Sequence, residues 1–269
     1  MITVTFGRVA HKAGQMGLFG FHEDASSAIS PEDQVDLRGR RWRFSQPQRM
    51  GGYLLGKLGY VRQAELMQTY YDEDARDFIE APAPASQVQY SRWALDLESQ
   101  MLVFERKPRV LETQAFVAAF RALLSLHPDR NLTVELVAEP SSFYEWQGSV
   151  DRIVHFRAVL RPPNPHWSGR TDQLKEIVDK PNASEVTLDL KSASEDGLRV
   201  QGTVLDEVVQ FQGEGYASVR AEGQSGDHTS RYDSGRKVAT DTVEIENPAD
   251  HRSMFSSMIQ ALRARIRRS

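Results

Sequence analysis

A strand–helix–strand pattern recurs after residue 92, and this recurrence constrains the fold more than any single motif does. It appears over residues 101–139, again over 153–191, and in a looser form over 216–266. In the first copy, "MLVFE" reads as a strand, "LTVELVAE" as another, and the residues between them have the apolar spacing of a helix: Phe116, Ala119, Phe120, Leu123 and Leu124. Only the order of elements recurs, because the three segments share no repeated sequence. The pattern predicts an α+β fold with mixed or antiparallel sheets, built from ferredoxin-like (split βαβ) modules.

The N-terminal part of the chain has a different character, with short alternating strands and frequent glycines. Ile2, Val4 and Phe6 alternate with polar residues, and "GYLLGKLGY" is strand-like with glycine punctuation. The stretch "EAPAPAS" at residues 80–86 combines prolines with small residues, which is typical of a stiff linker. The sequence therefore predicts two domains, a β-rich domain over residues 1–80 and an α+β domain over residues 87–269.

Composition excludes several classes of protein. The chain of 269 residues has no cysteine, which excludes disulfides, thiolate nucleophiles and cysteine-bound zinc and suits a reducing cytoplasm. No run approaches the roughly 18 apolar residues of a membrane span, and the start lacks the apolar core of a secretory signal. Phosphate-loop, dinucleotide-binding and zinc-protease motifs are absent, so the sequence predicts no cofactor. We therefore expect a cytoplasmic protein without membrane contact. Its net charge of −4 argues against a wholly basic nucleic-acid binder.

The charge is nevertheless uneven along the chain. Residues 38–62 hold seven basic residues and no acidic one, with four aromatic residues among them. Cations can neutralise phosphates and aromatic rings can stack on bases. Four arginines of this stretch are therefore candidates for phosphate contact: Arg40, Arg41, Arg43 and Arg49. In "RRWRF", alternation places Arg41 and Arg43 on one strand face and the rings of Trp42 and Phe44 on the other. The competing interpretation is a half-buried strand with a charged outer face. The acidic segment 72–80 is a candidate cover for this stretch.

The central strands have a polar face that offers further candidates. If the apolar residues of "RIVHFRAVL" and "EVTLDL" point to the core, His155, Arg157, Asp189 and Lys191 point away from it, and Arg220 belongs to the next strand. In ferredoxin-like sheets the face opposite the helices is often open, and RNA-binding modules use it. A solvated sheet face explains the same pattern, and the strands lack the aromatic signature of a standard RNA-recognition motif.

"LDLK" also has the D-x-K form of metal-dependent nucleases. Such sites need carboxylates that hold a hard cation and a lysine near the attacking water. Asp189 and Lys191 would act as catalytic residues with Mg²⁺, and Asp179 would be the upstream acidic partner. A match of three residues is common by chance, and Asp179 lies in a segment that resembles a helix end. No other metal site is predicted, because the histidines show no ligand spacing.

The last helix combines an apolar stripe with a basic end. Four arginines lie in its final turns: Arg263, Arg265, Arg267 and Arg268. Arginine at a helix C-terminus complements the helix dipole, which is the simplest account of them. Arg263 and Arg267 are also candidates for nucleic-acid contact. Alternatively, this helix docks on a protein partner, or the chain forms a homo-oligomer through a sheet edge.

Three stretches carry a loose resemblance to known sequences: "GYLLGKLGYVR", "LVFERKPRV" leading into "FVAAFRALL", and "VLRPPNP". Together they resemble uncharacterised bacterial protein families found among mobile-element and phage-defence genes. The resemblance implies a subunit of a cytoplasmic anti-phage system and transfers no catalytic residue. With the basic surfaces, it leads to the hypothesis of a non-enzymatic protein that interacts with DNA or RNA. A metal-dependent nuclease and a structural or regulatory subunit are the alternatives.

Overall fold

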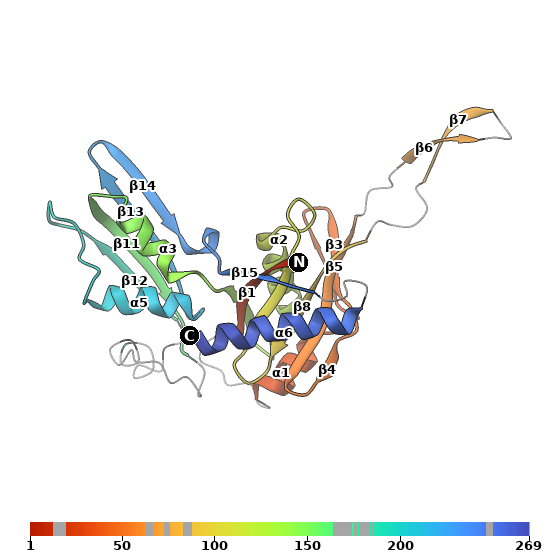
Figure 1. Cartoon of the computed structure of the whole chain (residues 1–269), viewed down its shortest axis with the longest axis horizontal. Coiled ribbons are helices and arrows are strands. Elements are labelled where there is room, and N and C mark those ends of the chain that lie inside the picture. The colour runs from red at the N-terminus through yellow and green to blue at the C-terminus, as the bar shows by residue number, and fades with distance from the viewer. Residues whose placement is uncertain are drawn as a thin grey trace.

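The strands of the protein form two main sheets that lie side by side, with a smaller hairpin projecting from the first of them (Figure 1). This computed structural model describes residues 1–12, 20–62, 67–72, 76–82, 88–163, 174, 177, 183, 185–245 and 250–268. Every strand pair in it is antiparallel, and helices pack on both main sheets. The α+β class predicted from the sequence is confirmed.

The first sheet has nine strands, and its main path runs in the order β10-β1-β9-β8-β5-β3-β2. In addition, β4 pairs with β5 and β15 pairs with β1. The strands are β1 (Ile2–His11), β2 (Gln34–Leu37), β3 (Arg40–Phe44), β4 (Gln48–Met50), β5 (Tyr53–Arg62), β8 (Val88–Asp96), β9 (Met101–Arg106), β10 (Leu132–Leu136) and β15 (Thr240–Val243). Helices α1 (Phe21–Ala28) and α2 (Thr113–Leu124) pack on one face of this sheet. As its spacing predicts, α2 buries Phe116, Phe120 and Leu124.

Four strands of this sheet have the ferredoxin-like arrangement. Strands β9 and β10 are both antiparallel to β1, which lies between them, so they run parallel and are joined by α2. In the same way β1 and β8 run parallel on either side of β9, and α1 lies in the connection between them. These are two interlocked split βαβ units. The strands β2 to β5 are inserted between α1 and β8 and extend the sheet.

The first sheet crosses the domain boundary predicted at residues 80–86. Strand β1 lies between β9 and β10, and β5 pairs with β8 from Tyr53–Asp96 to Val61–Val88. Strand β1 is thus part of the ferredoxin-like unit, β2 to β5 belong to the same sheet, and these N-terminal strands do not form a domain of their own. Proline and small residues indicate only that regular structure is interrupted locally. They do not indicate a domain boundary, because strands on either side of such an interruption can still pair. Residues 83–87 of the predicted linker lie outside the described residues.

The second sheet has four strands in the order β12-β11-β13-β14. Its elements are α3 (Pro140–Gln147), β11 (Arg152–Leu160), β12 (Val186–Lys191), α5 (Val204–Gly213), β13 (Ala217–Ser225), β14 (His228–Asp233) and the short 3-10 helix η1 (Ser234–Arg236). Strands β12 and β13 flank β11 and are joined by α5, which makes a further split βαβ unit. Thr203 caps α5 by accepting a hydrogen bond from the backbone N–H of Leu205. Helices α3 and α5 pack on one face of the sheet, and the core between them includes Phe143 and Phe156.

The C-terminal helix α6 (His251–Arg268) packs on the first sheet, on the face opposite α1 and α2 (Figure 1). Its apolar stripe includes Met254, Met258 and Leu262, and it contacts a cluster that includes Val4 and Val103. The helix itself is confirmed, and the protein's own sheet occupies its apolar stripe.

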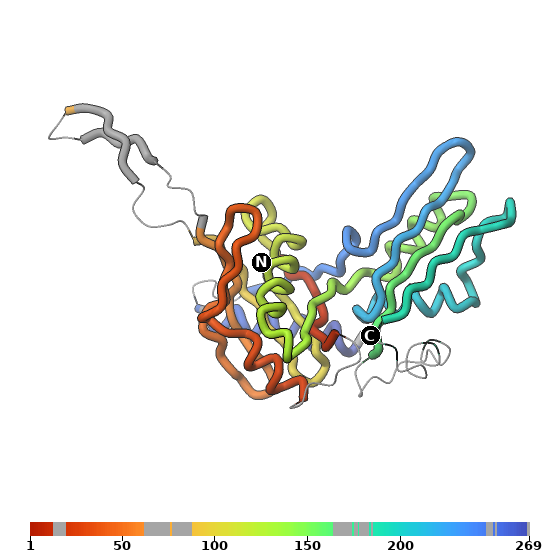
Figure 2. The backbone as a smooth tube through the Cα atoms, turned by 180° about the vertical axis from the view of Figure 1, so that it is seen from behind, coloured from red at the N-terminus to blue at the C-terminus, as the bar shows by residue number. Residues whose placement is uncertain are grey.

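Strands β6 (Met67–Asp72) and β7 (Asp77–Pro82) form the projecting hairpin and pair with each other. Figure 1 shows β6 and β7 extending away from the two main sheets, and Figure 2 shows the two main sheets from behind. The acidic segment 72–80, which the sequence offers as a candidate cover for the basic stretch, falls on this hairpin. Residues 73–75 and the side chains of most of this segment lie outside the described residues.

Two arginines connect the two sheets at the C-terminal end of α5. Arg8 Nε donates to the carbonyl oxygen of Glu214 at 2.6 Å, and Arg265 donates to the carbonyl oxygen of Gly213 at 3.3 Å. Arg265 Nη1 also donates to both carboxylate oxygens of Glu139, at 3.1 and 2.8 Å. Cations at this end of a helix complement its dipole.

Within the parts of the chain that the structure describes, no helix is long and apolar enough to cross a membrane.

Candidate nucleic-acid interface

Alternation along β3 divides the predicted basic stretch between two faces of the first sheet. Trp42 and Phe44 are each 2% exposed and belong to the core beneath α1 and α2. Arg41 and Arg43 point to the opposite face, as the sequence predicts. Arg41 Nε lies 3.4 Å from Asp36 Oδ1, and Arg43 donates to Gln34 Oε1 at 2.8 Å.

Three further cations surround Tyr90 on the same face as Arg41 and Arg43. Lys57 Nζ lies 5.0 Å from the centroid of the Tyr90 ring, Arg92 Cζ lies 5.4 Å from it, and Lys107 Nζ lies 4.5 Å from it. The electron-rich face of an aromatic ring attracts cations, so the ring holds these groups together. We call Tyr90, Lys57, Arg92 and Lys107 the Tyr90 cluster.

The register of the sheet explains how the Tyr90 cluster forms. Lys57 pairs with Arg92 across β5 and β8, and Gly59 pairs with Tyr90 in the next position of the same face. A side chain at Gly59 would meet the Tyr90 Cβ at 2.7 Å, so glycine permits this close approach. Arg43 pairs with Gly59 from the other side and extends the row. We call the Tyr90 cluster together with Arg41 and Arg43 the first face.

The Tyr90 cluster carries excess positive charge. Glu105 Oε2 lies 3.1 Å from Arg92 and 3.4 Å from Lys107, and both Arg92 and Glu105 are buried. Three cations and this one carboxylate leave a net charge of +2. Among the described residues, Lys57 forms no ion pair. Helix α6 covers the neighbouring part of the same sheet face, over Leu55, Ala94 and Val103, and leaves the first face outside that contact.

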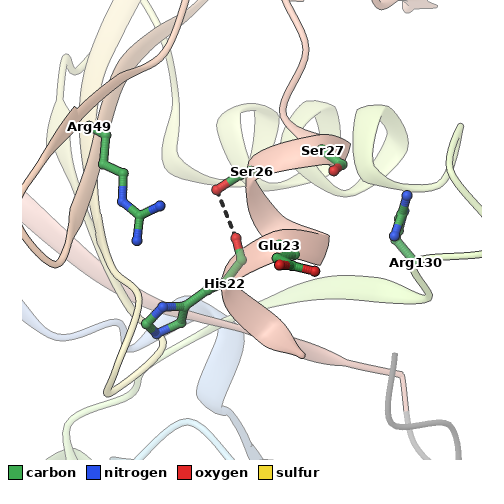
Figure 3. A pocket seen from close by; sticks show the side chains of 6 residues that line it. All are labelled: His22, Glu23, Ser26, Ser27, Arg49 and Arg130. Carbon is green, nitrogen blue, oxygen red and sulfur yellow. Dashed lines mark hydrogen bonds between the residues drawn. The ribbon is translucent and has the colours of Figure 1, made fainter. Parts of the chain in front are cut away.

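Arg40 and Arg49 lie apart from the first face. Arg40 stacks on the ring of Tyr60, with Cζ 4.5 Å from the ring centroid, on the side that holds the core. Arg49 lines an open pocket of about 380 Å³ beside α1. Figure 3 shows its guanidinium on the same side of the helix as His22, while Glu23 and Arg130 lie on the other side. The structure therefore keeps Arg41 and Arg43 together and places Arg40 and Arg49 at two other positions.

The second sheet brings three predicted residues together on the face opposite α3 and α5. Arg157 pairs with Arg220 across β11 and β13, and with Asp189 across β11 and β12. Lys191 pairs with His155 in the neighbouring row. The side chains of Arg157, Lys191 and Arg220 are exposed. We call His155, Arg157, Asp189, Lys191 and Arg220 the second face.

The predicted nuclease residues Asp189 and Lys191 share this face. Asp189 is bound to His155, with Nε2 2.7 Å from Oδ1, and this hydrogen bond lowers the pKa of the Asp189 carboxyl group. Among the described residues, no group of three histidine or carboxylate side chains is placed to hold a metal ion. Asp179, the proposed acidic partner, lies outside the described residues. The nuclease hypothesis stays a prediction.

The two predicted arginines of α6 have different surroundings. Arg263 Nε donates to the hydroxyl oxygen of Tyr53 at 3.0 Å, at the end of β5. Arg267 is exposed near the end of the helix. Neither residue belongs to the first or the second face.

Sequence reasoning did not single out the members of the Tyr90 cluster. Lys57 lies within the basic stretch, but Tyr90, Arg92 and Lys107 lie in "QYSRW" and "FERK", which look like ordinary strand residues. Alternation predicts which of them share a face within one strand. It does not predict which strands pair, so their convergence on one ring follows only from the sheet register.

Comparison with protein families supplies one match. A model described as a domain of unknown function (DUF4747) matches residues 59–260, more than half of the chain. No curated protein matches the sequence. The matched region includes β8, β9 and the whole second sheet, and therefore half of the first face and all of the second face. The chain belongs to the DUF4747 family.

Proposed function

We propose that this protein is a cytoplasmic nucleic-acid-binding protein whose first face contacts the phosphate backbone. The observation that carries the proposal is the Tyr90 cluster, in which one ring gathers three cations against a single carboxylate. Arg43 extends the positive charge along the same sheet face, while Arg41 beside it is paired with Asp36. A regular row of charge suits a ligand with regularly spaced phosphates.

The overall charge of the protein favours a binding site confined to one region of the surface. The chain carries a net charge of −4, so its surface as a whole does not attract a polyanion. A concentrated positive region on an acidic protein directs an anionic ligand to one place and orients it there. The half-buried lysines of the Tyr90 cluster would contact phosphate, while buried Arg92 would position the ring and Glu105.

We also propose that the protein acts as one subunit of a bacterial anti-phage defence system. This part rests on the resemblance of "GYLLGKLGYVR", "LVFERKPRV" and "VLRPPNP" to families found among such genes. A defence subunit that binds nucleic acid would have a protein partner or a second copy of itself. Co-expression with the neighbouring genes of its own genome, followed by purification of the complex, would identify that partner.

The proposed binding is tested by removing the two lysines of the Tyr90 cluster. In Lys57→Gln/Lys107→Gln, both side chains keep a similar length and lose their charge. We expect affinity for fluorescent single-stranded RNA, single-stranded DNA or duplex to fall about tenfold at low salt. We also expect the slope of log affinity against log salt to become shallower by about 1.4 on single strands and about 1.8 on duplex DNA, because two phosphate contacts are lost. Fluorescence anisotropy between about 50 and 200 mM salt measures both quantities.

The matched control is Lys12→Gln/Lys237→Gln, which removes the same charge from two exposed lysines outside both faces. Equal effects of the two double variants would show that binding depends only on net charge. Absence of binding by the unaltered protein to all three nucleic acids at low salt would contradict the proposed function itself. Circular dichroism of both variants verifies that they are folded.

A further inference from the structure

Strand β12 forms an outer edge of the second sheet and carries a row of apolar side chains there. It comes first in the order β12-β11-β13-β14, and among the described residues no strand pairs with its other side. Its pairing with β11 is regular over all six residues and contains no bulge. Val186 and Leu188 are only partly buried against the core, and Leu190 is 37% exposed. A regular edge strand with apolar residues is a surface on which another strand can pair.

The opposite edge of this sheet, β14, has no such apolar row. On the side that holds α3 and α5, its residues are polar and already have partners. Trp146 Nε1 donates to Ser230 Oγ at 3.0 Å, and the hydroxyl oxygen of Tyr232 lies 3.2 Å from Ser142 Oγ. Pairing at β14 would therefore bury little apolar surface, whereas pairing at β12 would cover its exposed leucine.

The backbone hydrogen bonds show which groups of β12 face outward. The N–H of Ser192 donates to the carbonyl oxygen of Val154 at 2.9 Å and so points towards β11, in a pair that continues the register of the two strands. Along an antiparallel strand, successive residues direct their backbone groups to opposite sides. The backbone groups of the three apolar residues therefore point to β11, and those of Thr187, Asp189 and Lys191 point outward. These outward groups are available to a strand of a second chain.

A second copy of β12 fits this edge in few registers. Two copies related by a two-fold axis pair antiparallel, and residues opposite each other lie on the same face of the joined sheet. An axis at Thr187 would place Glu185 opposite Asp189 of the second copy. An axis at Asp189 would place this carboxylate opposite its own copy. Both arrangements are unfavourable, because like charges directly opposite each other destabilise a strand pair.

An axis at Leu188 uses the whole strand. Val186 then lies opposite Leu190 of the second copy and Leu188 lies opposite itself, so the apolar row is covered along its length. On the other face Lys191 lies opposite Glu185 of the second copy, which gives one attractive pair on each side of the axis. An axis at Leu190 would pair only the last half of β12, which ends at Lys191.

We propose that the protein forms a homodimer in which the β12 strands of two copies pair about a two-fold axis at Leu188. The second sheets then join into one sheet of eight strands, four from each copy, with α3 and α5 of both copies on the same side. Thr187 and Asp189 supply backbone hydrogen bonds across the axis. The dimer uses no residue of the first face, so it forms whether or not nucleic acid binds there.

Cysteine crosslinking tests the position of the axis, because the chain has no cysteine of its own. In Leu188→Cys, the two thiols belong to a pair of opposite residues with Cα atoms about 4.5 Å apart, which suits a disulfide. In the control Leu190→Cys, the thiols are about 14 Å apart along the strands, which is too far. We expect mild oxidation to link most of Leu188→Cys, and little of Leu190→Cys, into a dimer that a reducing agent separates on a denaturing gel.

Charge reversal tests the contact between Lys191 and Glu185 in solution. We expect Lys191→Glu and Glu185→Lys each to weaken dimerisation about tenfold, since each places like charges opposite each other on both sides of the axis. Glu185→Lys/Lys191→Glu should restore dimerisation, because the charges are exchanged and attract again. The control Lys12→Glu reverses an exposed lysine beside β1 and should have no effect.

Sedimentation equilibrium over a series of protein concentrations gives the dimerisation constant of each variant. Glu185 also contacts Arg161 of its own chain, with Oε2 3.3 Å from Nη2, so circular dichroism verifies that each variant is folded.

The outcomes separate the dimer from its register and from the proposed function. A monomer mass for the unaltered chain at every concentration would overturn the homodimer. Crosslinking of Leu190→Cys that equals or exceeds that of Leu188→Cys would overturn the axis at Leu188, as would single charge reversals that the double variant does not rescue. Each of these results leaves the nucleic-acid binding of the first face intact, because Lys57, Lys107 and Tyr90 lie on the first sheet.

Discussion

At the scale of single residues, Tyr90 determines how the charge of the first face is arranged. The ring is the shared neighbour of Lys57, Arg92 and Lys107, and its backbone oxygen also accepts a hydrogen bond from Lys107 Nζ at 2.8 Å. Each exposed cation–π contact contributes about 0.5–1 kcal/mol to holding a cation in place. Without the ring, Lys57 would lose this attraction, while Lys107 would keep only its contacts with the Tyr90 backbone oxygen and Glu105.

We therefore expect Tyr90→Leu to weaken nucleic-acid binding about tenfold, the equivalent of about 1.4 kcal/mol. Tyr90→Phe keeps the ring and should remain within about twofold of the unaltered protein. Fluorescence anisotropy with the oligonucleotides used for the lysine variants measures both. Similar losses in the two variants would instead assign the effect to the Tyr90 hydroxyl group, to which Arg92 donates at 3.4 Å.

At the scale of elements, the sequence predicts local periodicity well and strand pairing poorly. The faces of β3, the helix α2 and the shared face of Asp189 and Lys191 all follow from side-chain spacing within one element. The arrangement of β1 between β9 and β10 depends on contacts about a hundred residues apart, which no local pattern encodes. For this reason the ferredoxin-like unit was predicted as a type of module but placed after residue 87. For the same reason the Tyr90 cluster was missed.

Helix α6 gives the prediction that belongs to this scale. Met258 is 0% exposed and packs between the helix and the first sheet. We expect Met258→Ala to lower the free energy of unfolding by about 2–5 kcal/mol, because it leaves a cavity in this layer. Gln260→Ala, on the exposed side of the same helix, should change it by less than about 0.5 kcal/mol. Urea denaturation followed by circular dichroism measures both, and equal values would contradict the packing of α6 on the sheet.

At the scale of the whole molecule, Arg8 joins the two sheets and so controls the relative direction of the two faces. It is 6% exposed, donates to Ser99 and Glu214 carbonyl oxygens at 2.6 Å each, and stacks on Tyr216 with Cζ 4.1 Å from the ring centroid. Burial lowers the pKa of the Arg8 guanidinium, yet arginine stays protonated at neutral pH. The junction therefore contains a buried positive charge stabilised by carbonyl dipoles and an aromatic ring.

We expect Arg8→Ala to lower the free energy of unfolding by about 3 kcal/mol. Two charge-assisted hydrogen bonds are lost, and part of that loss is offset because a charge no longer has to be desolvated. Arg236→Ala, at an exposed arginine, should change the free energy of unfolding by less than about 0.5 kcal/mol.

Because the chain has no cysteine, Val88→Cys/His228→Cys can be labelled at one exposed position on each sheet. Single-molecule energy transfer should then give a narrow distance distribution that Arg8→Ala broadens. An unchanged distribution in a destabilised variant would show that Arg265 and α6 alone fix the orientation of the two faces.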